Sequence, residues 1–402
     1  MSRVAKPKRV LMWTIFFVAM MQMAQVAVAP AIDMINTTVF PGSSLSLIQT
    51  VMSSLPSILS VLAGIISSVL IGFGVLSKKG ALVAGLFFVV LTGVVAIVMH
   101  TQLWQLVLYS VILGVGMGAF IPAAQSIMVD NFDEKERQFM SGLQFSFLNG
   151  GGILMSIVGG ILTTFIWFGG YIVLLAAFPV AVFAIFSVPA DKKNKRSLSG
   201  EKPKRNKLPR DVYYYAALSL IHILLYNVGT SNISTHIVAH GLGDAASAGV
   251  ATALMMGGGV VMGIFFFKVS SALRDQIFAL SFVAIFVGYT MLNVFSSSFF
   301  MVCVAMVILG TSLSMVVPQI IYRVSNIVDP TNSAIATMYI ASVMPGLGGF
   351  LSPLVFTELI SRVGINTTDA RYQFVAFIAL ALTVLLSLNA IRRDRQGKRN
   401  MV

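Results

Sequence analysis

Residues 191 to 210 read DKKNKRSLSGEKPKRNKLPR, and nine of them are Lys or Arg. This stretch is polar and has no apolar periodicity, which is typical of a solvated linker. On each side of it the chain consists mostly of apolar runs that are long enough to cross a bilayer as helices. We therefore expect an N-terminal domain over 1–189, a basic cytoplasmic linker over 190–211 and a C-terminal domain with a basic tail over 212–402.

The apolar runs predict an all-α integral membrane protein with six spans in each half. Of the 402 residues, 57% are hydrophobic and 10% are charged, with a mean hydropathy of +0.90. A soluble domain carries roughly 25% charged residues, so this composition excludes a water-soluble globule. The predicted spans lie over 10–32, 47–73, 81–99, 103–128, 141–164, 167–188, 212–235, 246–267, 276–296, 299–322, 334–358 and 372–391.

The basic residues indicate how the chain is oriented in its membrane. With the amino terminus in the cytoplasm, the Lys and Arg residues gather on cytoplasmic loops and tails, and only Arg362 and Arg371 fall on the other side. This asymmetry is the positive-inside pattern. The net charge of +13 therefore reflects membrane orientation and does not indicate a nucleic-acid partner. We expect a multi-pass plasma-membrane protein with both termini in the cytoplasm.

Several classes of chemistry have no support in the sequence. The single cysteine, Cys303, excludes an internal disulfide, and no Cys/His cluster has metal-ligand spacing, which also excludes structural zinc. The phosphate-binding pattern G-x-x-x-x-G-K-[ST] is absent. We therefore expect no enzyme, no cofactor and no metal, and any transport has to use an existing gradient.

The two halves of the chain resemble copies of each other. A shift of 196 residues superposes Gly114 on Gly310 and Pro122 on Pro318. The same shift superposes Asp133 on Asp329, Gly150 on Gly346 and Gly152 on Gly348. With six spans on each side of a linker, these matches favour a pseudo-symmetric transporter.

Local motifs extend this interpretation to a family. The loop after the second span, LIGFGVLSKKG, keeps the basic pair of the pattern G-x-x-x-D-R-x-G-R-R as Lys78 and Lys79. The fourth span resembles R-x-x-x-G-x-G-x-G, with Ser110 at the Arg position, and the fifth span, GGILMSIVGG, resembles the exporter pattern G-x-x-x-G-P-x-x-G-G. The whole chain thus resembles the major facilitator superfamily. The resemblance implies two pseudo-symmetric six-helix bundles, with the first, fourth, seventh and tenth spans lining a central cavity.

The seventh span carries the main candidate for coupling. Ser219, His222 and Tyr226 follow helical spacing and form one polar stripe. His222 lies about ten residues into the span, near the bilayer midplane. A histidine with an ordinary pKa of roughly 6.5 exchanges protons near physiological pH. The alternative is a neutral histidine that is hydrogen-bonded between helices.

Amides and a tyrosine complete the candidate pathway. In the first span Gln22 and Gln25 share one helix face, which the resemblance places opposite the seventh-span stripe. The remaining candidates are Gln125, Asn149, Gln319 and Tyr339. For each of the amides, an interhelical hydrogen bond is at least as good an interpretation as ligand contact.

The distribution of charge suggests the class of solute. No Asp, Glu, Lys or Arg falls at midplane, and four acids lie at the outer ends of spans, namely Asp33, Asp244, Glu358 and Asp369. Because a buried ion needs a partner of opposite charge, we expect a small neutral or amphipathic organic solute. The alternatives are a multidrug exporter and a transporter-like receptor or scaffold. The expected partners of this monomer are the solute, the lipid bilayer and, as a candidate coupling ion, the proton.

Overall fold

The computed structural model describes residues 6–28, 31–35, 39–43, 47–48, 50–190, 208–243, 245–328, 336, 339–360, 362 and 364–399. All regular structure in these ranges is helical, and they contain no strand. Most of the expected linker, residues 191–207, lies outside them.

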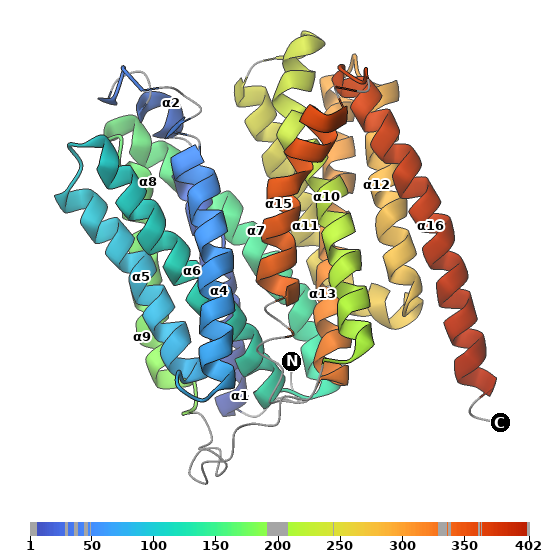
Figure 1. The fold of residues 1–402 in the computed structure, drawn as a ribbon, viewed down its shortest axis with the longest axis horizontal. Helices are drawn as coiled ribbons and strands as arrows, with labels where there is room; N and C mark the ends of the chain where they lie inside the picture. Colours follow the sequence, from blue (N-terminus) through green and yellow to red (C-terminus); the bar gives the residue numbers. More distant parts are fainter. Residues whose placement is uncertain are drawn as a thin grey trace. The chain divides into compact units, whose positions relative to one another are not determined.

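Ten helices of the described ranges are long and apolar enough to cross a membrane (Figure 1). Each coincides with one predicted span. They are α4 Leu55–Gly72, α5 Lys78–Val98, α6 Leu103–Asn131, α7 Glu134–Phe165, the run α8 Gly169–Val173 to α9 Ala177–Ser187, α10 Arg210–Ala239, α11 Ala245–Leu273, α12 Gln276–Val294, α13 Phe299–Ile327 and α16 Thr368–Arg399.

The first predicted span is interrupted. Helix α1 covers only Lys6–Met21 and is followed by a 3-10 turn, η1 Ala24–Ala27, and a short helix, α2 Ile32–Met34. The sequence of the predicted span contains Pro30, and proline lacks an N–H and disfavours helical backbone before it, so a continuous helix to residue 32 is unfavourable. Gln22 and Gln25 consequently lie in and beside a broken segment rather than on one regular helix.

The eleventh predicted span is also irregular. A π-helical turn, η7 Tyr339–Val343, precedes α15 Met344–Pro353, and a second π-helical turn, η8 Leu354–Leu359, follows it. Pro345 lies in the first turn of α15, directly after η7, and Pro353 is the last residue of α15 before η8. Wide turns of this kind leave backbone groups outside the regular helical pattern.

Residues of the described chain fall into two compact units. Unit 1 consists of residues 1–140, 147–215 and 321–346, and unit 2 of residues 141–146, 216–320 and 347–402. In unit 1, α6 packs closely on α4 and on α5. A Cβ added to Gly85 of α5 would stand 2.6 Å from the carbonyl oxygen of Gly116 on α6, so only glycine permits this approach.

Unit 2 has its own helix packing. Helices α12 and α16 lie side by side (Figure 1). Helices α11 and α13 approach so closely that a Cβ on Gly258 would overlap the carbonyl oxygen of Val307, and one on Gly310 would overlap that of Met255. Small residues at such contacts are typical of membrane bundles.

Large apolar side chains remain exposed on both units. Phe165 is 77% exposed and Phe186 84% in unit 1, and Phe300 is 71% exposed in unit 2. Exposed aromatic side chains on this scale are unfavourable in water and suit the hydrocarbon of a bilayer. The surface therefore agrees with the composition of the chain.

Candidate functional site

The seventh-span stripe lies inside unit 2, on α10. His222 is completely buried, with its ring centroid 5.4 Å from that of Phe282 on α12 and 6.2 Å from that of Tyr226. Ser219, three residues earlier, is also completely buried, and Tyr226 is half-buried. The helix therefore directs a polar row into an aromatic environment.

Neither ring nitrogen of His222 has a hydrogen-bond partner among the described residues, and the same holds for the hydroxyl of Ser219. Buried polar atoms nearly always have partners, and each exception needs an explanation. A structural histidine that bridges two helices would show such a bond. The described residues therefore give no support to the interpretation of His222 as a histidine that is hydrogen-bonded between helices.

The backbone hydrogen bonding of α10 is altered by a side chain of α12 about one turn beyond His222. The hydroxyl of Tyr289 on α12 donates to the carbonyl oxygen of Leu225 at 2.5 Å, and the amide of Gly229 donates to the same hydroxyl at 2.7 Å. Leu225 and Gly229 are four residues apart and would be direct partners in a regular helix. A side chain that binds both groups is a recognised cause of helix bending.

The expected amides of unit 1 differ in their surroundings. Gln25 accepts a hydrogen bond from the Ser57 hydroxyl on α4 at 3.3 Å. The side-chain nitrogen of Gln22 and the side-chain oxygen of Gln125 are buried and have no partner in the described part of the chain. Asn149 on α7 is also buried, with 4% exposure.

The last two candidates lie in different units. Gln319 on α13 accepts from the Ser270 hydroxyl at 2.5 Å and donates to the carbonyl oxygen of Arg274 at 3.4 Å. These bonds join α13 to the end of α11, which is a packing role within unit 2. Tyr339 is half-buried in the π-helical turn η7, in unit 1.

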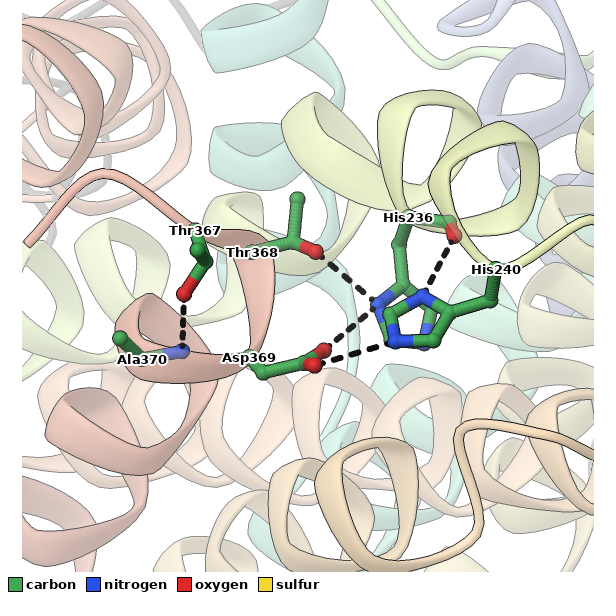
Figure 2. A network of polar contacts seen from close by, with 6 residues as sticks. All are labelled: His236, His240, Thr367, Thr368, Asp369 and Ala370. Carbon is green, nitrogen blue, oxygen red and sulfur yellow. Dashed lines mark hydrogen bonds and ion pairs between the residues drawn. The ribbon is translucent and has the colours of Figure 1, made fainter.

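A polar cluster that the sequence did not predict lies where α10 ends and α16 begins, as Figure 2 shows. Nδ1 of His236 lies 3.2 Å from Oδ1 of Asp369, and Nε2 of His240 lies 3.0 Å from Oδ2 of the same carboxylate. Nδ1 of His236 also lies 3.1 Å from the hydroxyl of Thr368. His236 is completely buried, whereas His240 and Asp369 are partly exposed.

The sequence holds a signal for part of this cluster. His236 and His240 are four residues apart, so they share one face of a helix, as in zinc-binding helices. The third member, Asp369, is 129 residues further along the chain, and no spacing rule connects it to the pair. The expectation that no Cys/His cluster has metal-ligand spacing overlooks this i, i+4 pair.

All polar side chains that the structure buries are neutral or are histidines. Among the described side chains, the buried polar ones are Ser, Thr, Gln, Asn and His, and none is Asp, Glu, Lys or Arg. Of the four outer acids, Asp369 has a described side chain, and those of Asp33, Asp244 and Glu358 lie outside the description.

Residues 11–353 match the model of the Major Facilitator Superfamily. The chain belongs to this superfamily. Its members are transporters and not enzymes, so this membrane protein is a secondary transporter, and the predicted family and fold are confirmed. A search of curated protein sequences found no match.

Solved superfamily structures share the fold across almost the whole chain. The human organic anion transporter MFSD10 (TETRAN) is 12% identical with a TM-score of 0.75, over 95% of this chain and 100% of that one. FucP in the outward conformation is 15% identical with a TM-score of 0.67, over 96% and 98%. The proton:xylose symporter XylE, bound to 6-bromo-6-deoxy-D-glucose, is 14% identical with a TM-score of 0.70, over 94% of each chain.

Proposed function

We propose that this superfamily member moves a small neutral or amphipathic organic solute across the plasma membrane by alternating access. The two moving parts are the bundles 1–189 and 212–402, joined by the linker 190–211. The observation that carries the proposal is the absence of Asp, Glu, Lys and Arg among the buried described side chains.

The physical argument concerns the cost of desolvation. An ionised solute that leaves water for a low-dielectric interior needs a partner of opposite charge with good hydrogen-bond geometry. Hydroxyl and amide groups satisfy a neutral solute without this requirement, because they both donate and accept. XylE, solved with a neutral sugar derivative, is an example of the fold with such a ligand. At 14% identity it adds nothing about the solute of this chain.

The centre of the proposed pathway consists of those predicted site residues whose buried polar atoms have no hydrogen-bond partner among the described residues. In unit 2 these are His222 and Ser219, and in unit 1 they include Gln22 and Gln125. A solute or proton that binds these atoms removes the penalty of an unpaired buried polar group. Gln25, Tyr226, Asn149 and Tyr339 are proposed as further contacts, and Gln319 as the weakest one because packing bonds already hold it.

Proton coupling is a further part of the proposal and depends on His222. This residue lies about ten residues into its span, near mid-bilayer, and exchanges a proton in each transport cycle.

The orientation of the chain follows from its charges. Lys and Arg residues on the N-terminal segment, the linker and the tail support an orientation with both termini in the cytoplasm. We also propose that the protein acts as a monomer.

The first test is the thermal stability of purified protein against a broad solute panel, at about pH 5.5 and 7.5, because a ligand of the folded state raises apparent stability. Stabilisation by one series of neutral or zwitterionic compounds supports the proposal. Stabilisation by many unrelated lipophilic cations would favour multidrug export. Compounds that bind are then tested for saturable flux in proteoliposomes, and binding without flux would indicate a receptor.

A further inference from the structure

The cluster of His236, His240 and Asp369 has the geometry of a metal site. One ligand atom from each residue can be chosen so that all three lie within 4.8 Å of one another. Ligand atoms bound about 2.1 Å from a tetrahedral Zn²⁺ stand about 3.4 Å apart. The two nitrogen–oxygen separations, 3.2 and 3.0 Å, are close to this value.

Hydrogen bonds around His240 fix which of its nitrogens carries a proton. Its Nδ1 lies 2.9 Å from the carbonyl oxygen of His236, and a carbonyl oxygen only accepts, so Nδ1 carries the proton. In the neutral ring, Nε2 then presents a lone pair to an oxygen of Asp369. Two acceptors at 3.0 Å repel each other unless a cation, either a proton or a metal ion, lies between them.

His236 offers a second lone pair from a buried position. Its Nδ1, the atom that lies 3.2 Å from Oδ1 of Asp369, is also 3.1 Å from the hydroxyl of Thr368. A histidine ligand usually donates one ring N–H to a neighbouring oxygen and binds the metal through the other nitrogen. For His240 this orienting partner is the carbonyl oxygen of His236, and Nε2 is left for the metal.

The local charges also permit a cation at the cluster. Arg371, two residues after Asp369, donates to the side-chain oxygen of Asn232 at 2.9 Å. Asn232 lies one helical turn before His236 on α10, so this guanidinium group already has a partner on α10. The Asp369 carboxylate supplies the one negative charge among the three ligands.

We propose that His236, His240 and Asp369 bind a divalent first-row transition ion, with Zn²⁺ the preferred one, and thereby join α10 to α16 within unit 2. Two imidazoles and one carboxylate are ligands that Zn²⁺ favours, with water completing the coordination. Residues 237–239 are Ile, Val and Ala, so no acid in this segment serves as a general base, and the proposed role is structural or regulatory. The proposal is independent of which solute the protein moves.

The test measures metal binding on purified full-length protein from which any affinity tag has been removed. Co²⁺ serves as the spectroscopic probe and Zn²⁺ as its competitor. We expect one equivalent of Co²⁺ to give the visible bands of a low-coordinate site, and Zn²⁺ to abolish them. Asp369→Asn and His240→Ala should each weaken Zn²⁺ binding by at least about 100-fold, since even the loss of an outer-shell partner costs 10–100-fold.

The matched control is His100→Ala. His100 follows α5 in unit 1, with its ring centroid 4.5 Å from that of Phe168, and its removal should leave Zn²⁺ binding unchanged. Gel filtration without metal checks that each variant is folded. If a variant does not fold, hydrogen exchange of the wild-type protein provides the answer, because Zn²⁺ should protect amides near residues 236–240 and 367–372. A wild-type protein without stoichiometric binding, or binding retained in both cluster variants, would overturn the proposal and leave a proton between His240 and Asp369.

Discussion

The amide of Gly229 donates to the hydroxyl of Tyr289 at 2.7 Å, and that hydroxyl donates in turn to the carbonyl oxygen of Leu225. All three atoms belong to buried residues of unit 2. Tyr289→Phe removes these bonds at a fully buried position, and we expect it to lower the free energy of unfolding by about 1–3 kcal/mol. Thermal unfolding in detergent, with hydrogen exchange at the Gly229 amide, measures this effect.

Tyr372→Phe is the matched control for that substitution. Tyr372 stacks on Tyr289 with ring centroids 5.3 Å apart, but its buried hydroxyl has no hydrogen-bond partner among the described residues. Its removal should be neutral or stabilising. Equal losses of stability in the two variants would mean that ring packing, and not the bonds to α10, determines the effect.

The fold was predictable because lipid imposes a simple rule on sequence. Only helices and closed barrels satisfy all their backbone groups in a bilayer, so apolar runs of sufficient length indicate helices directly. The rule is incomplete at the first and eleventh spans. At the eleventh span Pro345 and Pro353 lie next to the π-helical turns η7 and η8, whereas Pro122 of α6 lies within a helix that continues to Asn131. Hydropathy does not distinguish these cases.

The contacts of the candidate site were less predictable than the fold. Helical spacing placed Ser219 and His222 on one face of a helix, which is a local property of the chain. Which helix that face meets is a matter of tertiary packing, and the ring of Phe282 opposite His222 could not be derived from the sequence. The same limit applies to Asp369, which meets His240 only because α16 begins where α10 ends.

His222→Phe separates the functional from the structural interpretation of this histidine. Neither ring nitrogen has a partner in the described part of unit 2, so replacing it by an apolar ring should leave the unfolding temperature unchanged or raise it. Proton-driven accumulation of the solute should be lost, and in His222→Gln as well, because neither variant exchanges a proton at this position. A large loss of stability with transport intact would show that His222 is structural.

Tyr322→Phe tests a set of contacts between the start of α7 and the end of α13, both in unit 1. The Tyr322 hydroxyl donates to Oε1 of Glu134 at 2.7 Å, and Arg137 donates to the carbonyl oxygen of Ser325 at 3.1 Å. Since the tyrosine bond is exposed, its loss should cost only about 0.5–1.5 kcal/mol. Tyr213→Phe, at a side chain that is 55% exposed, should cost less. Equal unfolding temperatures for the two variants would contradict a stabilising bond to Glu134.

Two adjacent glycines of α11 give the sharpest test of helix packing. A Cβ on Gly258 would overlap the carbonyl oxygen of Val307 on α13, whereas one on Gly257 would meet no heavy atom of the described residues within 4 Å. Gly258→Ala forces two backbones apart and should destabilise the protein by about 1–3 kcal/mol. Gly257→Ala adds a methyl group in open space and should be neutral or stabilising by up to about 1 kcal/mol, because alanine restricts the unfolded chain. Thermal unfolding of both variants decides the matter, and a Gly258→Ala protein as stable as Gly257→Ala would mean that α11 and α13 do not approach this closely.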